Sequence, residues 1–232
     1  MSSVAIITAR GGSKRIPRKN IKEFLEKPII AYSIEAALKS GVFDEVMVST
    51  DDEEIAEIAR KYGAEVPFLR SEATSNDFAT TADVITEVLD RYKEMGKEFD
   101  SFICIYPTAP FITAEKIKNA FDLFWEKEAD ALIPVVKFSF PPQRGFVCKG
   151  NFIQYQYPEF ALKRSQDLEP VYHDCGQFYV CNTARFLETK AIVMEKTVPY
   201  VIPETEVQDI DTLTDWVLAE EKYRMLYLEG NN

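Results

Sequence analysis

The chain has 232 residues, the length of one domain or of one domain with a small additional lobe. With 27 Lys and Arg against 38 Asp and Glu, its formal net charge of −11 argues against nucleic-acid binding, which usually needs a basic surface. One histidine and four cysteines without a Cys-x-x-Cys pair argue against structural zinc and against Ser-His or Cys-His hydrolysis. The first apolar run, residues 4–7, is too short for a signal sequence or a membrane span, so we expect a cytoplasmic protein with reduced thiols.

Strand and helix patterns alternate along the first 140 residues. Short apolar runs predict strands over 4–8, 45–50, 65–69, 102–106 and 131–138. Apolar residues at helical spacing predict helices over 28–41, 52–63, 85–92 and 113–124. The alternation predicts an α/β fold with a mostly parallel sheet and helices on both of its faces. Ligands of such sheets bind beyond the carboxyl ends of the strands, which selects the loops 9–20, 50–52 and 107–111.

The pattern changes after residue 140. Residues 141–181 contain two adjacent prolines, several aromatic residues and short alternating stretches, but no clear helix. We interpret them as an antiparallel hairpin excursion from a single domain over 1–232, serving dimerisation or substrate binding. Helices are expected again over 183–189 and 212–228, with a strand over 197–202 between them.

The loop after the first strand is rich in glycine and positive charge. Gly11 and Gly12 let the backbone turn tightly and bring its N–H groups close to an anion, and Ser13 adds a hydroxyl donor. A triphosphate needs this combination of backbone donors and charge neutralisation, although a solvated basic turn would have the same composition. Five cations lie within ten residues: Arg10, Lys14, Arg15, Arg18 and Lys19.

Two aspartates precede the last predicted helix. Asp209 and Asp211 flank Ile210, and residues two apart in an extended segment project to the same side. Two converging carboxylates suit Mg²⁺, which takes oxygen ligands and usually completes its shell with water and substrate phosphates. Alternatively, Asp211 only caps the following helix.

The segment 105–111 is the third signal. Pro107 and Pro110 flank Thr108 and stiffen a loop at the carboxyl end of a strand, where a ligand is expected. An ordinary turn between a strand and a helix could have the same sequence pattern.

Together these segments resemble the cytidylyltransferases that activate eight- and nine-carbon sugar acids as CMP-sugars. The family pattern ARxGSKxxxxKN matches residues 9–20, its STD signature matches 49–51, its PTSP loop is similar to 107–110, and its DxDTxxD segment matches 209–215. The resemblance implies a Rossmann-like nucleotidyltransferase sheet and a reaction in which the anomeric hydroxyl of the sugar acid attacks the α-phosphorus of CTP. Pyrophosphate leaves, and no protein nucleophile is needed.

The resemblance also implies roles for individual residues. The catalytic residues would be Lys14, Arg10 and Asp211, and Asp209 and Asp211 would bind Mg²⁺. The protein would be a homodimer in which each excursion reaches towards the sugar site of its partner. The residues expected to bind CTP are Arg10, Gly11, Gly12, Ser13, Lys14, Lys19, Asn20 and Arg70.

The choice of sugar acid depends on other positions. The stretches 154–167 and 172–179 look most like those of members that act on pseudaminic acid, whereas sialic acid enzymes usually carry glutamine where this chain has Tyr106. N-acetylneuraminate and ketodeoxyoctonate are the alternative substrates, and a nucleotide-binding sensor without turnover is the alternative to an enzyme. The residues expected at the sugar are Tyr106, Arg164, Gln177 and Tyr179, with Arg144, Lys163 and His173 as further candidates.

Overall fold

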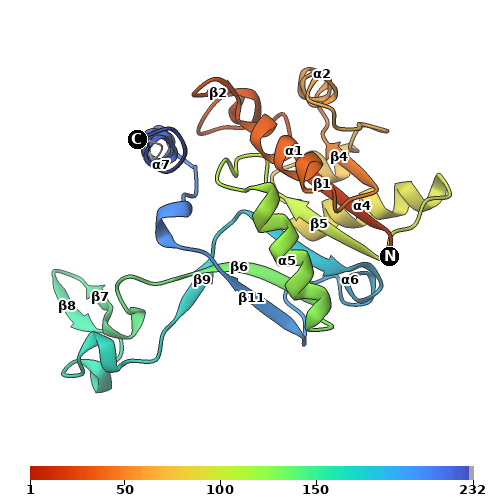
Figure 1. Cartoon of the computed structure of the whole chain (residues 1–232). Helices are drawn as coiled ribbons and strands as arrows, with labels where there is room; N and C mark the ends of the chain where they lie inside the picture. Colours follow the sequence, from red (N-terminus) through yellow and green to blue (C-terminus); the bar gives the residue numbers. More distant parts are fainter. Residues whose placement is uncertain (230–232) are drawn as a thin grey trace.

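A mixed sheet of seven strands forms the centre of the molecule (Figure 1). The computed structural model describes residues 1–229. The strands run in the order β11–β6–β10–β5–β1–β4, and β9 pairs with β6 beside this path. β1 is parallel to β4 and β5, and β11 is parallel to β6, whereas β10 is antiparallel to both of its neighbours. The bounds are β1 Ser3–Thr8, β4 Glu45–Ser49, β5 Ser101–Ile105, β6 Ala131–Lys137, β9 Tyr172–Asp174, β10 Phe178–Asn182 and β11 Thr197–Val201.

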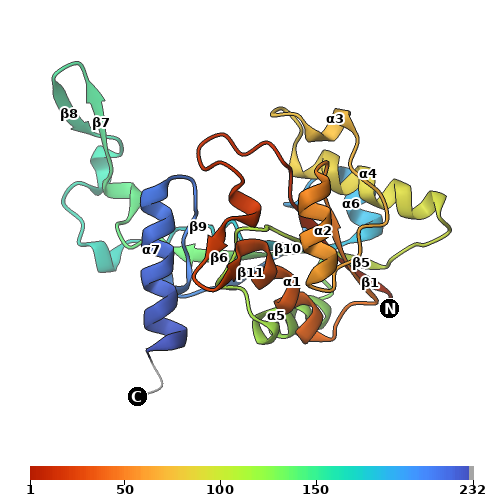
Figure 2. The ribbon, with the colours of Figure 1, turned by 90° about the horizontal axis from the view of Figure 1, so that it is seen from above.

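Helices cover both faces of the sheet (Figure 2). They are α1 Ile29–Ser40, α2 Glu53–Lys61, α3 Glu72–Ser75, α4 Thr81–Glu94, α5 Ala114–Glu126, α6 Thr183–Thr189 and α7 Leu213–Tyr223, which continues as a π-helical turn over Arg224–Leu228. Ala5 and Ile7 of β1 pack towards α1, α2 and α5, while Val4 and Ile6 pack towards α4 and α6. Alternation along the strand thus gives each face its own apolar layer. The fold class predicted from the sequence is confirmed.

Helix ends follow the chemistry of the residues expected there. The Asp52 carboxylate accepts a hydrogen bond from the backbone N–H of Ile55 and so caps α2, and Thr113 caps α5 in the same way. α1 begins after Pro28 and ends at Gly41, whose φ of 64° is in the left-handed region that favours glycine. The starts predicted for these three helices and the end of α1 are confirmed, whereas α2 ends at Lys61 and α5 continues to Glu126, past the predicted end at 124.

The strand predicted over 65–69 is wrong. Glu65 forms a single bridge to Met47, with hydrogen bonds to Val46 and Val48, and the pairing then stops. Pro67 explains the stop, because proline has no backbone N–H to donate to the next rung of the ladder.

The end of the predicted excursion lies within the main sheet. β10 is inserted between β5 and β6 and is buried over Phe178–Cys181, and β9 pairs with β6. Before β9, the hairpin of β7 (Phe146–Lys149) and β8 (Phe152–Tyr155) projects away from the body in both views (Figures 1 and 2). The apolar run Phe178–Val180 drives the insertion, since a strand buried on both faces belongs in the middle of a sheet.

A third apolar cluster connects the loops at the edge of the sheet. It joins Ile16 of the loop 9–20 (the basic loop) and Ile210 of the segment 209–211 (the aspartate segment) to Phe111 and to Trp216 of α7. Ile16 and Ile210 are each 1% exposed. Burying an isoleucine contributes about 1.5–3 kcal/mol, so the cluster holds the basic loop and the aspartate segment against each other. Within residues 1–229, no helix has the length and apolarity to cross a membrane.

Candidate active site

The loop 9–20, the segment 105–111 and the aspartate segment meet around one cavity of about 550 Å³. β1 and β5 are adjacent and parallel, so the basic loop after β1 and the residues after β5 emerge at the same edge of the sheet. The aspartate segment reaches this edge through the apolar cluster of Ile16 and Ile210. The cavity is lined by Arg10, Ser13, Lys14, Lys19 and Asn20 of the basic loop, by Tyr106, Pro107 and Thr108, and by Asp209.

Internal hydrogen bonds close the basic loop. The Asn20 amide donates to the carbonyl of Arg10 over 2.9 Å and is buried. Lys19 Nζ donates to the carbonyl of Ile210 over 2.6 Å, which ties the loop directly to the aspartate segment. Asn20 and Lys19 therefore fix the shape of the loop where it lines the cavity, and Arg10 and Lys14 supply positive charge at the cavity wall.

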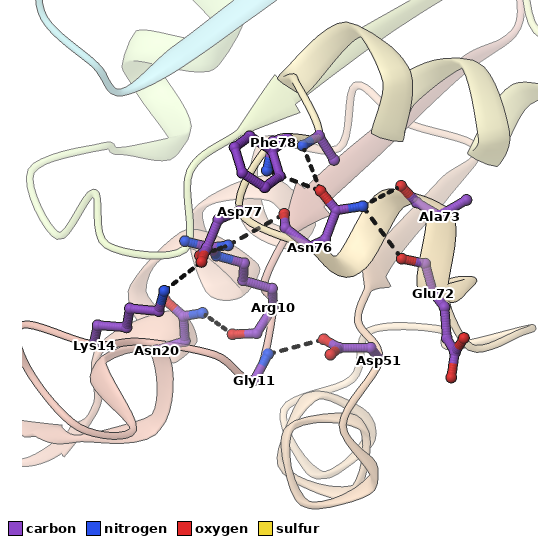
Figure 3. Close-up of polar contacts among 11 residues, drawn as sticks. Arg10, Gly11, Lys14, Asn20, Asp51, Glu72, Ala73, Asn76, Asp77 and Phe78 are labelled. Atoms are coloured by element: carbon purple, nitrogen blue, oxygen red, sulfur yellow. Dashed lines mark hydrogen bonds and ion pairs between the residues drawn. The ribbon is translucent and has the colours of Figure 1, made fainter.

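The cations at the wall are already paired with carboxylates. Arg10 Nη1 lies 2.8 Å from Asp77 Oδ1, and Lys14 Nζ contacts the other oxygen of the same carboxylate (Figure 3). These partners hold the pKa of Asp77 below its ordinary value, Lys14 more strongly than Arg10. Asp77 was not singled out from the sequence, where it has no motif to mark it.

Asp209 and Asp211 differ in their surroundings. Asp211 Oδ1 lies 2.8 Å from Arg15 Nη2 and 3.6 Å from Lys19 Nζ. Loss of solvent raises the pKa of Asp209, and the Asp211 carboxylate raises it further. Neighbouring carboxylates that disfavour each other's charge are suited to a shared cation. Among residues 1–229 no group of three or more His, Cys, Asp or Glu forms a metal cluster, so other ligands would have to come from substrate or water.

The turn after β4 supports the basic loop from the opposite side. Asp51 Oδ1 accepts a hydrogen bond from the backbone N–H of Gly11 over 2.8 Å (Figure 3). A Cβ on Gly11 would lie 2.8 Å from Asp52 Oδ2, whereas a Cβ on Gly12 would meet nothing within 4 Å. A side chain at position 11 would thus collide with the Asp52 carboxylate, whereas Gly12 faces open space beside the loop.

Arg70 lies beneath this turn. Its guanidinium is buried and donates to the carbonyl of Ser49 over 2.6 Å and to the Ser49 hydroxyl over 3.1 Å. Burial lowers the pKa of Arg70, and the Asp51 carboxylate opposes this shift. Arg70 is not among the residues, within 1–229, that line the 550 Å³ cavity.

Two tyrosines and a glutamine lie on the side towards β10, where Tyr106 lines the 550 Å³ cavity and Tyr179 and Gln177 are buried behind it. The Tyr106 and Tyr179 rings meet edge to face at 5.7 Å, and the Tyr179 hydroxyl donates to Asp174 Oδ2 over 2.6 Å. Burial raises the pKa of both phenols. The Gln177 amide is 3% exposed and donates to the carbonyl of Glu206 over 2.7 Å, so it anchors the segment before Asp209 from inside the protein.

A second cavity of about 660 Å³ adjoins the first through Asp209, which lines both. His173 lies at its wall, 4.6 Å from the Phe138 ring, with Nδ1 2.9 Å from the carbonyl of Asp174. Lys137 and Lys222 also line it. The sequence did not indicate this cavity, because β6, β9 and the 204–209 segment that form it are far apart in the chain.

Arg164 lies elsewhere. It lies in the segment 140–171 that carries the β7–β8 hairpin (the projecting lobe). Its side chain is 71% exposed and is paired with Asp167 at 2.8 Å. Arg144, on the same lobe, donates to the Ser165 hydroxyl over 3.2 Å. Within the described part of one chain, neither residue lines either of the two cavities, and the same holds for Gly11, Gly12, Arg70, Gln177, Tyr179 and Asp211.

A family model described as cytidylyltransferase matches residues 4–176, which is most of the sheet and all of the basic loop. The chain belongs to the cytidylyltransferase family. A pseudaminic acid cytidylyltransferase of Campylobacter jejuni is 42% identical to it over 97% of both proteins. A CMP-N,N′-diacetyllegionaminic acid synthase of Legionella pneumophila is 35% identical over 95% of this chain and 96% of that protein.

Solved structures agree on the fold. A CMP:2-keto-3-deoxy-manno-octonic acid synthetase in complex with CTP superimposes with a TM-score of 0.68, covering 97% of this chain and 98% of that one at 17% identity. The family resemblance inferred from the sequence is confirmed, and this cytidylyltransferase is an enzyme of the nucleotidyltransferase class.

The two loop glycines predict different effects on stability. Gly11→Ala forces Asp52 to move away from its cap on α2, and we expect a loss of about 1–2 kcal/mol of unfolding free energy, the size of a lost cap. Gly12→Ala places a methyl group in open space and should change stability by less than about 0.5 kcal/mol. Urea unfolding of both variants measures the difference, and equal losses would contradict the contact between Gly11 and Asp52.

Proposed function

We propose that this enzyme transfers CMP from CTP to the anomeric hydroxyl of pseudaminic acid and releases pyrophosphate. The observation that carries the proposal is the pair of adjoining cavities that share Asp209. One is walled by the basic loop and suits a triphosphate. The other is large enough for a nine-carbon sugar acid, and relatives 42% identical to this chain are named for that substrate.

The triphosphate lies against the basic loop in this proposal. Arg10, Lys14 and Lys19 neutralise its charge, the Ser13 hydroxyl donates to it, and the open face of Gly12 lets phosphate approach the backbone. Displacement at phosphorus depends mainly on positioning and charge stabilisation, so cations fixed by hydrogen bonds and ion pairs are the appropriate machinery. Gly11 and Asn20 shape the loop, and Arg70 supports the turn after β4 on which Gly11 rests.

Asp209 and Asp211 fit Mg²⁺ as two carboxylate ligands. Bound there, the cation would neutralise triphosphate charge and assist the departure of pyrophosphate. Asp209 lies between the two cavities and faces the place where nucleotide and sugar acid meet. Asp211 is held by Arg15 and Lys19, which orient its carboxylate beside the basic loop.

The sugar acid lies in the larger cavity. Tyr106 lines the neighbouring smaller cavity and packs edge to face on the buried Tyr179, and Gln177 fixes the segment that leads to Asp209. An aromatic wall suits a sugar with a methyl group at its end better than one with a hydroxyl group. Arg164 would reach the sugar carboxylate only from a second copy of the chain.

The projecting lobe argues for that second copy. It exposes large apolar side chains at Phe140, Phe146, Phe152, Ile153 and Leu162. Exposed apolar side chains gathered on a projecting lobe mark an interaction site, and two-fold dimers are the commonest homo-oligomers.

Turnover tests the function directly. With CTP, Mg²⁺ and pseudaminic acid, we expect pyrophosphate release and a CMP-sugar by mass spectrometry. Lys14→Ala should reduce kcat/KM by roughly a hundredfold or more, the effect of losing one charge-stabilising contact. Its folding should be unchanged because the side chain is 77% exposed. A folded variant with wild-type turnover would remove Lys14 from the reaction, and nucleotide binding without pyrophosphate release would indicate a sensor.

Chelation tests the metal. EDTA should abolish turnover, and Mg²⁺ should restore it. Asp209→Asn keeps the shape of the side chain but removes its charge, so we expect a Mg²⁺ requirement raised by about tenfold or more. Activity that persists in EDTA would contradict the aspartate site.

Competition between sugar acids tests specificity. A buried hydroxyl without a partner costs about 1–3 kcal/mol, so kcat/KM for pseudaminic acid should exceed that for N-acetylneuraminate by roughly tenfold. Both constants are measured at saturating CTP and Mg²⁺. Equal or reversed values would reject pseudaminic acid and leave CMP transfer intact.

Light scattering tests the assembly. At micromolar concentration we expect the mass of a dimer, and Phe152→Glu together with Ile153→Glu should give monomers by placing charge in the interface. A monomeric wild-type protein would contradict the assignment of Arg164 to a partner's sugar site.

A further inference from the structure

Asp77 is the contact between the basic loop and a separate part of the chain. It lies in the turn between α3 and α4, and its two oxygens are divided between Arg10 and Lys14 (Figure 3). Arg10 Nη1 also donates to the carbonyl of Asn76 over 3.3 Å. The turn therefore holds both cations of the cavity wall at once.

The turn itself is rigidly built. Asn76 Oδ1 accepts from the backbone N–H groups of Phe78, over 2.8 Å, and Ala79, over 3.1 Å (Figure 3). Asn76 Nδ2 donates to the carbonyl of Ala73 over 2.7 Å. Such a closed Asx turn fixes the direction in which the next residue, Asp77, projects.

Both ends of the turn are fastened to α4. The capping box of Thr80 and Asp83 fixes the downstream end. Upstream, the Glu87 carboxylate accepts from the backbone N–H of Ser71 over 2.8 Å and contacts the Thr74 hydroxyl. Asp77 is thus held by the body of the protein and not by the loop that it contacts.

The contact leaves both cations able to bind phosphate. Asp77 uses one terminal nitrogen of Arg10 and one of the three ammonium protons of Lys14. Two cations and one carboxylate leave the group with net positive charge. An exposed lysine otherwise samples many rotamers, and ordering it when ligand binds opposes affinity.

We propose that Asp77 is a positioning residue that orders Arg10 and Lys14 for the triphosphate before the nucleotide arrives. The inference rests on the nucleotide site proposed above. Simple electrostatics predicts that removing the negative charge of Asp77 from a phosphate site would tighten phosphate binding. The positioning role predicts the opposite, a weaker affinity.

The test is the affinity of CTP and of inorganic tripolyphosphate, by calorimetry without sugar acid. Asp77→Asn should weaken both by roughly fivefold, the effect of one exposed ion pair, and should raise KM for CTP more than it lowers kcat. Cytidine, which has no phosphate, should bind as to the wild type. Asn76→Ala keeps every charge but opens the turn, and should weaken both ligands in the same direction.

Glu54→Gln is the matched control. It removes the same charge from a partner of Arg18, which belongs to the basic loop but does not line the 550 Å³ cavity within residues 1–229, and should leave both affinities within about twofold. Unchanged or tighter binding by Asp77→Asn overturns the inference, as does an equal loss in Glu54→Gln. If Asp77→Asn does not fold, Asn76→Ala decides alone by the same criterion. A wild-type protein that neither binds CTP nor releases pyrophosphate refutes the proposed function instead.

Discussion

The burial of Ile210 and Ile16 in one apolar cluster is the constraint on which the site depends. Side chains alternate along an extended segment, so a buried Ile210 turns Asp209 and Asp211 to the opposite side, away from the apolar cluster. The same cluster fixes Ile16 in the middle of the basic loop. One apolar cluster thereby brings carboxylates and cations that are almost two hundred residues apart in the chain to one edge of the sheet.

Charge is then arranged locally, against the acidity of the whole protein. At −11 the protein repels a nucleotide at long range, so the cavity must collect its own cations. Each cation has an internal carboxylate partner: Asp77 for Arg10 and Lys14, and Asp211 for Arg15 and Lys19. These exposed pairs add little to stability, but they order long side chains that would otherwise be mobile. In the proposed function, this paired state prepares the cations for an anion.

Local chemistry made much of this predictable from the sequence. The basic loop, the aspartate pair and the caps at Asp52 and Thr113 depend on residues near each other in the chain. The insertion of β10 was missed, since antiparallel pairing between β5 and β6 is decided by contacts far apart in sequence. Asp77 was missed for the same reason: nothing local distinguishes it from other surface aspartates, and only the fold brings it to Arg10.

The central claim is that the basic loop binds the triphosphate of a cytidine nucleotide. Calorimetry with CTP, CDP and CMP, in the absence of metal, tests it most directly. Each phosphate removed takes away charge-assisted hydrogen bonds to the loop, so affinity should fall in the order CTP, CDP, CMP, by roughly tenfold for each phosphate. Equal affinities for CTP and CMP would show that the loop does not hold the phosphates and would contradict the account.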